Sequence, residues 1–116
     1  MFPVLISIGS NIRQAAHVQW ASQQLARLLE NPRFSRKLWT KDIKGTEAWY
    51  MNRLVAGFSP MSDEELRSIL KNLEAETKRN SSGVTIDLDL MQHGDLRFHE
   101  RDWSRPYILQ LINDVT

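Results

Sequence analysis

The segment of residues 84–90, Val-Thr-Ile-Asp-Leu-Asp-Leu, constrains the fold more than any other stretch of the chain. Apolar residues alternate there with Asp87 and Asp89, which is the period-two pattern of a half-buried β-strand. Side chains at positions i and i+2 of a strand point to the same face, so the two carboxylates stand side by side, about 7 Å apart at their bases. The pattern therefore predicts a strand with an apolar core on one face and paired acids on the other.

The paired acids have two interpretations. Carboxylates held this close repel each other, and Asp is depleted in strands, so the pair calls for a positive partner. A hard divalent cation such as Mg²⁺ takes carboxylate and phosphate oxygens and is the natural candidate. The alternative is a solvated edge of a sheet, on which the two acids serve solubility. The spacing alone leaves both interpretations open.

Length and composition predict one domain over residues 1–116. The chain has 116 residues, 41% of them hydrophobic and 25% charged, as in ordinary globular proteins. A net charge of +1 gives no reason to expect a nucleic acid as partner. The absence of cysteine excludes disulfides and thiolate chemistry, and no apolar run is long enough for a membrane span. We expect a cytoplasmic protein that binds neither nucleic acid nor membrane.

The periodicity of the remaining chain predicts an α+β protein. Residues 62–65, Ser-Asp-Glu-Glu, form a capping box that begins a helix. Strands are expected over 2–8, 34–40, 50–58 and 84–90, long helices over 12–30 and 63–78, and a short helix over 107–115. The order β-α-β-β-α-β predicts a ferredoxin-like sandwich, with a mixed or antiparallel sheet and both long helices on one face.

Four motifs in this order resemble one family. They are Leu-Ile-Ser-Ile-Gly-Ser-Asn at 5–11, Tyr-Met-Asn at 50–52, Leu73-Glu74 with Arg79, and Thr-Ile-Asp-Leu-Asp-Leu-Met at 85–91. The chain resembles the 6-hydroxymethyl-7,8-dihydropterin pyrophosphokinase (HPPK) family of folate biosynthesis over most of its length. Members of that family transfer pyrophosphate from ATP to the hydroxymethyl group of a reduced pterin, with two Mg²⁺ ions.

The resemblance assigns roles to the candidate residues. It implies that Asp87 and Asp89 hold both Mg²⁺ ions, which bridge and neutralise the triphosphate. It implies that Tyr50 stacks on the pterin ring, while the Asn52 amide bonds to the edge of the ring. Thr40 is expected to offer backbone contacts to the same ring. For Tyr50, the alternative is an aromatic residue at the margin of the core.

The resemblance also implies a nucleotide site. Glu74 and Arg79 near the end of the second long helix are expected to face ATP, with Arg79 as a catalytic cation, and Ser104 is expected to reach the nucleotide. For Arg79, the alternative is an ordinary surface charge at a helix end, where a cation is favourable.

The sequence departs from the family pattern in its catalytic parts. The long loop of the family shrinks to residues 80–83, Val84 stands where the family has an Arg, and Tyr107 replaces a His. The sequence printed here stops at Thr116, earlier than the family usually does. The candidates to supply the missing charge are the basic residues of the second strand and the loop after it, Arg36, Lys37, Lys41 and Lys44. The alternative is that they form an ordinary solvated basic patch.

These departures leave three functional hypotheses. The first is an HPPK-like enzyme, with activity reduced by the losses, since each lost contact to the phosphate costs on the order of 10²-fold in rate. The second is a catalytically degenerate HPPK-like module that binds ligand without transferring a group. The third is an interaction domain, with vestigial acids and a homo-oligomeric assembly.

Overall fold

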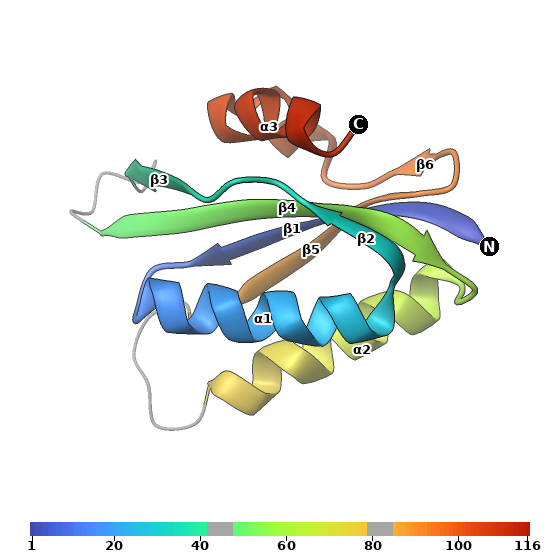
Figure 1. Ribbon diagram of the computed structural model, residues 1–116, viewed down its shortest axis with the longest axis horizontal. Coiled ribbons are helices and arrows are strands. Elements are labelled where there is room, and N and C mark those ends of the chain that lie inside the picture. Colours follow the sequence, from blue (N-terminus) through green and yellow to red (C-terminus); the bar gives the residue numbers. More distant parts are fainter. Residues whose placement is uncertain (42–47, 79–84) are drawn as a thin grey trace.

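The computed structural model describes residues 1–41, 48–78 and 85–116 (Figure 1). Within these residues, six strands form one antiparallel sheet in the order β2-β4-β1-β5-β6, and β3 pairs with β4 as well. The elements are β1 (Phe2–Ser10), α1 (Gln14–Leu28), β2 (Glu30–Phe34), β3 (Leu38–Lys41), β4 (Trp49–Ser59), α2 (Asp63–Thr77), β5 (Asp87–His93), β6 (Leu96–Arg97), the 3₁₀ turn η1 (Glu100–Ser104), α3 (Pro106–Leu111) and the 3₁₀ turn η2 (Ile112–Asp114). The expected α+β order with a short C-terminal helix is confirmed.

Both long helices cover one face of the sheet, as the sequence predicts (Figure 1). The apolar residues of α1 and α2 pack there against alternate residues of the strands, and this is the larger part of the core. Its fully buried members include Ile6, Ile8, Val18, Leu25, Leu66, Leu70 and Leu90. The predicted capping box is present: Ser62 accepts a hydrogen bond from the Glu65 amide, and the Glu65 side chain accepts one from the Ser62 amide.

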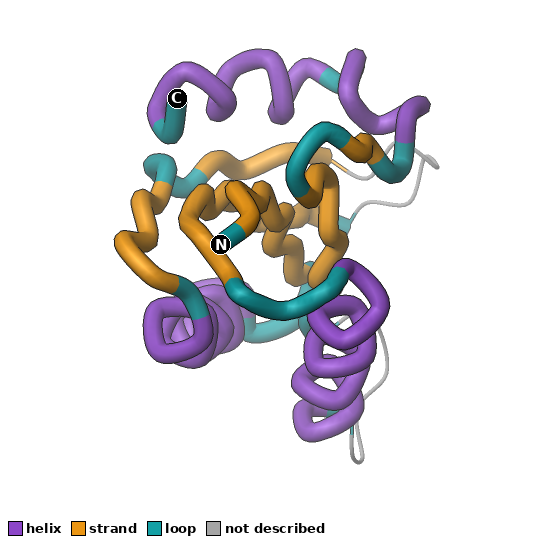
Figure 2. Tube along the Cα trace, turned by 90° about the vertical axis from the view of Figure 1, so that its right-hand side faces the viewer, coloured by secondary structure: helices purple, strands orange, loops and turns teal. Residues whose placement is uncertain are grey.

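The opposite face of the sheet carries α3, which makes a third layer (Figure 2). A smaller apolar cluster fills this interface; it consists of Leu5, Leu54, Met91, Ile108, Leu111 and Val115. Farther along the central strands, the same face becomes polar: Leu5 is followed at i+2 by Ser7, and Leu54 is preceded at i−2 by Asn52. The short helix thus covers only the apolar part of this face, and the polar part borders a cavity.

The predicted strand over 34–40 is divided into β2 and β3. The Ser35 hydroxyl accepts a hydrogen bond from the Leu54 amide at 2.8 Å and donates one to the carbonyl of Arg36 at 2.7 Å. A side chain therefore takes the place of a backbone group in the ladder, which interrupts the regular strand. The predicted helix over 12–30 runs only from Gln14 to Leu28, because Leu29 already has an extended backbone and β2 begins at the next residue. Pro32 lies in this irregularly paired edge strand, a position that tolerates proline.

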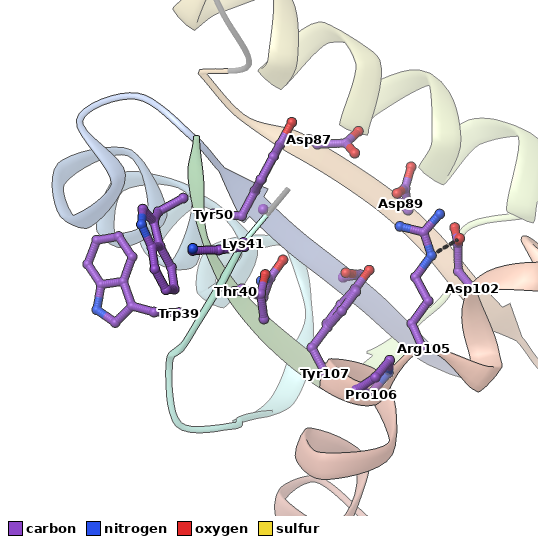
Figure 3. A pocket seen from close by; sticks show the side chains of 14 residues that line it. Trp39, Thr40, Lys41, Tyr50, Asp87, Asp89, Asp102, Arg105, Pro106 and Tyr107 are labelled. Atoms are coloured by element: carbon purple, nitrogen blue, oxygen red, sulfur yellow. Dashed lines mark hydrogen bonds and ion pairs between the residues drawn. The ribbon is translucent and has the colours of Figure 1, made fainter. Parts of the chain in front are cut away.

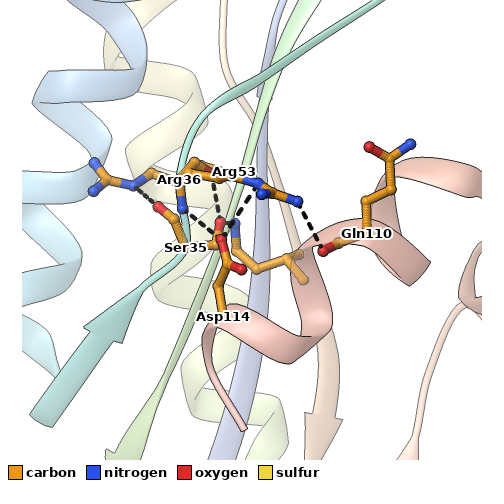
Figure 4. A network of polar contacts seen from close by, with 6 residues as sticks. Ser35, Arg36, Arg53, Gln110 and Asp114 are labelled. Atoms are coloured by element: carbon orange, nitrogen blue, oxygen red, sulfur yellow. Dashed lines mark hydrogen bonds and ion pairs between the residues drawn. The ribbon is translucent and has the colours of Figure 1, made fainter.

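The C-terminal segment is attached to the junction between β2 and β3 (Figure 4). The Arg36 amide donates to Oδ2 of Asp114 at 3.0 Å, and the Arg36 guanidinium donates to the carbonyl of Gln110 at 3.4 Å. At the same junction, Nε of Arg53 donates to the carbonyl of Ser35 at 2.8 Å. These bonds hold α3 over the sheet and thereby place the residues at its start beside the cavity.

The strand with the paired acids begins and ends later than predicted. Regular pairing starts at Asp87 and continues to His93, while Thr85 and Ile86 are buried ahead of it. Thr85 bonds through its hydroxyl to Thr77 at the end of α2, at 3.0 Å. This hydrogen bond attaches residues 85 and 86 to α2, where strand pairing is absent. Among the described helices, none has both the length and the apolar character needed to span a membrane.

Candidate active site

A cavity of about 600 Å³ lies on the polar part of the sheet face that carries α3 (Figure 3). Strands β1, β3, β4 and β5 supply its floor and walls, and the segment from η1 to α3 closes one side. The lining residues are Ser7, Gly9, Trp39, Thr40, Lys41, Trp49, Tyr50, Asn52, Asp87, Asp89, Asp102, Arg105, Pro106 and Tyr107. The structure thus brings five of the eight predicted site residues to one cavity: Thr40, Tyr50, Asn52, Asp87 and Asp89.

The register of the sheet sets the layout of the floor. Gly9 of β1 pairs with Asn52 of β4 on one side and with Asp87 of β5 on the other. Neighbouring strands lie about 4.8 Å apart, so the amide and the carboxylate stand about 10 Å apart at their bases, with no side chain between them. A Cβ atom at Gly9 would lie 3.5 Å from Oδ1 of Asn52 and would occupy this floor. The glycine leaves a bare strip on which a flat ligand can lie.

The two carboxylates are unfavourable as charged neighbours. Burial, and after it the negative charge of Asp87, raise the pKa of Asp89 to about 6, although His99 acts in the opposite direction. Asp87 reaches solvent at the mouth of the cavity, but partial burial of its carboxyl still raises its pKa. Nε2 of His99 lies 3.8 Å from Oδ1 of Asp89. Burial is the largest cause of both shifts, and it outweighs the opposing effect of His99.

The chemistry of the pair fits a hard divalent cation. Carboxylate oxygens are the protein ligands that Mg²⁺ prefers, and a cation would favour the charged form that burial disfavours. In the described part of the chain, no group of three or more His, Asp or Glu side chains is arranged as a metal site. Mg²⁺ commonly binds through one or two carboxylates, with water and substrate phosphates completing its coordination. Asp87 and Asp89 are suited to that role and not to a closed metal site.

At the other end of the floor, Asn52 is buried, and a hydrogen bond holds its side-chain amide. Its Nδ2 donates to Oγ1 of Thr40 on the neighbouring strand at 2.6 Å. Tyr50 is half-buried, and its hydroxyl accepts a hydrogen bond from Nδ2 of Asn11 at 3.3 Å. The Thr40 side chain therefore fixes the orientation of the Asn52 amide, and the predicted backbone contact of Thr40 to the ring stays a prediction.

Of the three predicted nucleotide residues, the two that the structure describes are not among those that line the cavity. Glu74 is on α2, where its Oε1 accepts the Leu88 amide at 2.9 Å, and it does not line the cavity. The pKa of Glu74 is raised by burial, although the hydrogen bond from the Leu88 amide acts in the opposite direction. Ser104 is exposed at the end of η1 and donates to the Arg101 carbonyl at 3.3 Å. Arg79 lies outside the described residues.

The cavity also contains residues that the sequence did not single out as site residues. Ser7 and Gly9 alternate with buried isoleucines in β1, and this alternation of small or polar with apolar residues was a usable signal. Tyr107 lines the cavity, and burial raises the pKa of its phenol, which is therefore neutral at pH 7. Asp102 and Arg105, on the same η1–α3 segment as Tyr107, form an ion pair of 2.8 Å. No local pattern in the sequence marked that pair.

Comparison with known proteins decides the family. A family model described as 7,8-dihydro-6-hydroxymethylpterin-pyrophosphokinase (HPPK) matches residues 5–116, a range that includes every residue lining the cavity. The chain belongs to the HPPK family. A folate synthesis bifunctional protein of Arabidopsis thaliana is 28% identical to it over 79 residues. That alignment covers 57% of this chain but only 16% of the plant protein.

Membership confirms the resemblance noted in the sequence. HPPK proteins are ATP-dependent pyrophosphokinases of folate biosynthesis, so the family supplies a reaction in which a flat pterin and a triphosphate must meet. In this HPPK domain, Asn52 and the paired acids stand at opposite ends of one open floor. The same cavity thus offers hydrogen-bonding groups for a ring and carboxylates for metal-bound phosphates.

Proposed function

We propose that this chain transfers pyrophosphate from ATP to the hydroxymethyl group of a reduced pterin. The row formed by Asn52, Gly9 and Asp87 carries the proposal. It supports a pose in which the pterin lies over Gly9, bonds to Asn52 at one end and turns its hydroxymethyl group toward the acids. In this pose Tyr50 packs against the ring, and the hydrogen bond between Thr40 and Asn52 supports an oriented amide.

Asp87 and Asp89 are proposed to hold two Mg²⁺ ions together with the triphosphate. Bound Mg²⁺ supplies the positive charge that neutralises phosphate oxygens during the transfer. The raised pKa of Asp89, about 6, supports this role because a nearby cation would stabilise its carboxylate. In the transfer, the pterin hydroxyl oxygen bonds to the β-phosphorus, the bond between the α,β-bridging oxygen and that phosphorus breaks, AMP leaves, and the hydroxyl proton is released.

Glu74, Arg79 and Ser104 stay in the proposal as nucleotide residues, with different support. The Glu74 carboxylate approaches β5 from α2 and stands within electrostatic reach of Asp87, so it is near the metal strand although outside the cavity lining. Ser104 precedes Arg105 at the cavity wall. For Arg79, the support is the family motif alone.

The decisive experiment measures AMP formation with ATP, Mg²⁺ and 6-hydroxymethyl-7,8-dihydropterin. The control is the double variant Asp87→Ala/Asp89→Ala, shown by circular dichroism to be folded. AMP that requires both the pterin and the intact acids is the expected result. AMP at the level of the control would rule out the transfer.

A binding module without transfer is the second candidate, and the neutral Tyr107 phenol and Val84 at two phosphate-facing positions of the family favour it. It predicts that calorimetry detects pterin and nucleotide binding while no AMP is formed.

We further propose that residues 1–116 act as one cytoplasmic domain, consistent with its use of ATP. Light scattering tests the expectation of a homo-oligomer.

A further inference from the structure

The paired acids and a bound triphosphate would together concentrate negative charge in one cavity. Among the described residues that line it, the basic side chains are Lys41 and Arg105. Nζ of Lys41 lies over the ring of Trp49, 5.5 Å from its centroid, at the end of the cavity farther from Asp89 (Figure 3). Arg105 stands at the other end, on the same side of the cavity as Asp89 (Figure 3).

The guanidinium of Arg105 is oriented before any ligand binds. Its Nε lies 2.8 Å from Oδ1 of Asp102, and both side chains are partly buried. Contacts among the described residues do not engage its Nη atoms, so the outer edge of the guanidinium remains available as a donor. An Arg also keeps its charge at any physiological pH, and its planar donors match phosphate oxygens in pairs.

The segment that carries Arg105 is itself held in place. The indole of Trp103 donates to the Phe98 carbonyl at 3.0 Å, and the guanidinium of Arg97 lies over the Trp103 ring at 4.1 Å from its centroid. On the other side, the bonds from Arg36 to the C-terminal segment hold α3 on the sheet. Arg105 therefore projects into the cavity from a support fixed at both ends.

We infer that Arg105, oriented by Asp102, contacts the triphosphate and supplies phosphate-facing charge that Val84 does not provide. The inference rests on the proposed function, because it concerns the nucleotide of that same site. Arg105 is then a catalytic residue that stabilises the phosphate oxygens during transfer, and Asp102 is a positioning residue. The sequence alone did not suggest either role.

The test compares Arg105→Gln with Arg101→Gln, which removes the same charge from an exposed position four residues earlier and outside the cavity lining. We expect Arg105→Gln to lower kcat/KM for AMP formation on the order of 10²-fold. It should also weaken binding of Mg²⁺ with α,β-methylene-ATP about tenfold by calorimetry. Arg101→Gln should change both quantities less than about twofold.

A third variant, Asp102→Asn, separates charge from support. We expect it to keep most nucleotide affinity while lowering kcat, because the guanidinium stays charged but is less well oriented. Arg105→Lys should recover part of the affinity lost in Arg105→Gln. Urea unfolding of each variant shows whether the fold is intact.

The outcomes distinguish this inference from the proposed function. If wild-type protein forms AMP and Arg105→Gln behaves like Arg101→Gln, the role of Arg105 is overturned and the transferase stands. If wild-type protein forms no AMP but Arg105→Gln alone weakens analogue binding, transfer is overturned and the phosphate contact stands. Failure of the folded wild-type protein to bind the analogue overturns the inference as well.

Discussion

The two faces of the sheet are made by the same strands but have opposite characters. In β5, Leu88 and Leu90 pack under the long helices, while Asp87 and Asp89 face the cavity. β1 divides in the same way, with isoleucines on the helix face and small or polar residues on the cavity face. The first face is arranged for burial, and the second keeps open space and places like charges together.

This difference shows where the stability and the chemistry of the protein lie. Apolar burial on the helix face is the main favourable contribution to folding. On the cavity face, the two neighbouring acids, whose pKa values are raised, oppose folding at neutral pH in the absence of a cation. The proposed site is therefore supported by the face behind it, and neighbouring residues of one strand should respond oppositely to substitution.

The largest expected effect separates activity from stability. Asp89→Asn should lower AMP formation on the order of 10³-fold, because it removes a charged metal ligand without changing the size of the side chain. Its stability should be unchanged or higher than that of wild type, because repulsion with Asp87 is relieved. Kinetic assay and urea unfolding of the same preparation check both statements. A variant that loses activity only because it unfolds would contradict them.

The adjacent residue provides the reverse case. Leu90 is fully buried under the helices, so Leu90→Ala should reduce the free energy of unfolding by about 3 kcal/mol through lost burial and a cavity. Molecules that remain folded should retain their affinity for nucleotide. Urea denaturation measures the first quantity, and calorimetry at low temperature measures the second. If Leu90→Ala lost as much nucleotide affinity as Asp89→Asn, the distinction between the two faces would be contradicted.

The pH dependence of stability sharpens the comparison. The folded pKa of Asp89, about 6, lies above its usual value, so the folded state binds more protons than the unfolded state between about pH 4 and pH 6. The contribution of Asp89 to the free energy of unfolding, on the order of 3 kcal/mol, is fully present below pH 4 and is lost as the pH rises through 6. Urea unfolding of metal-free wild type and Asp89→Asn across this range should show a steeper decline in wild type, because Asp87 and Glu74, whose pKa values are also raised, remain in the variant.

The smallest expected effect concerns the other end of the floor. Thr40→Val keeps the shape of the side chain but removes the hydroxyl that accepts from Asn52 at 2.6 Å. Pterin affinity should fall about tenfold, since the amide is left less well oriented. Calorimetric titration with 6-hydroxymethyl-7,8-dihydropterin checks this. Unchanged affinity would mean that Asn52 does not bind the ring through this orientation.

Much of the fold could be predicted because it depends on local periodicity. The alternation in β1, the capping box at Ser62 and the paired acids each identify an element and its buried face. The division between β2 and β3 was not predictable in this way. It depends on the Ser35 hydroxyl bonding to Leu54, a residue 19 positions away in the sequence.

Site residues that share a strand could be predicted from the sequence. Site residues that come together from distant segments of the chain could not. Asp87 and Asp89 are placed together by their spacing, and the structure puts them in the cavity. Arg105 and Asp102 could not be predicted as site residues, because a 3₁₀ turn and a short helix have no periodic sequence pattern. The position of that segment depends on contacts with distant residues.

By itself, the sequence determined the β-α-β-β-α-β order, the apolar face of each strand and the pairing of the two acids. These follow from side-chain spacing along one element, which is a local property. The tertiary structure decided that Gly9 separates Asn52 from Asp87 and that Arg105 enters the same cavity. Both depend on sheet register and on the attachment of α3, which arise only when segments far apart in the chain pack together.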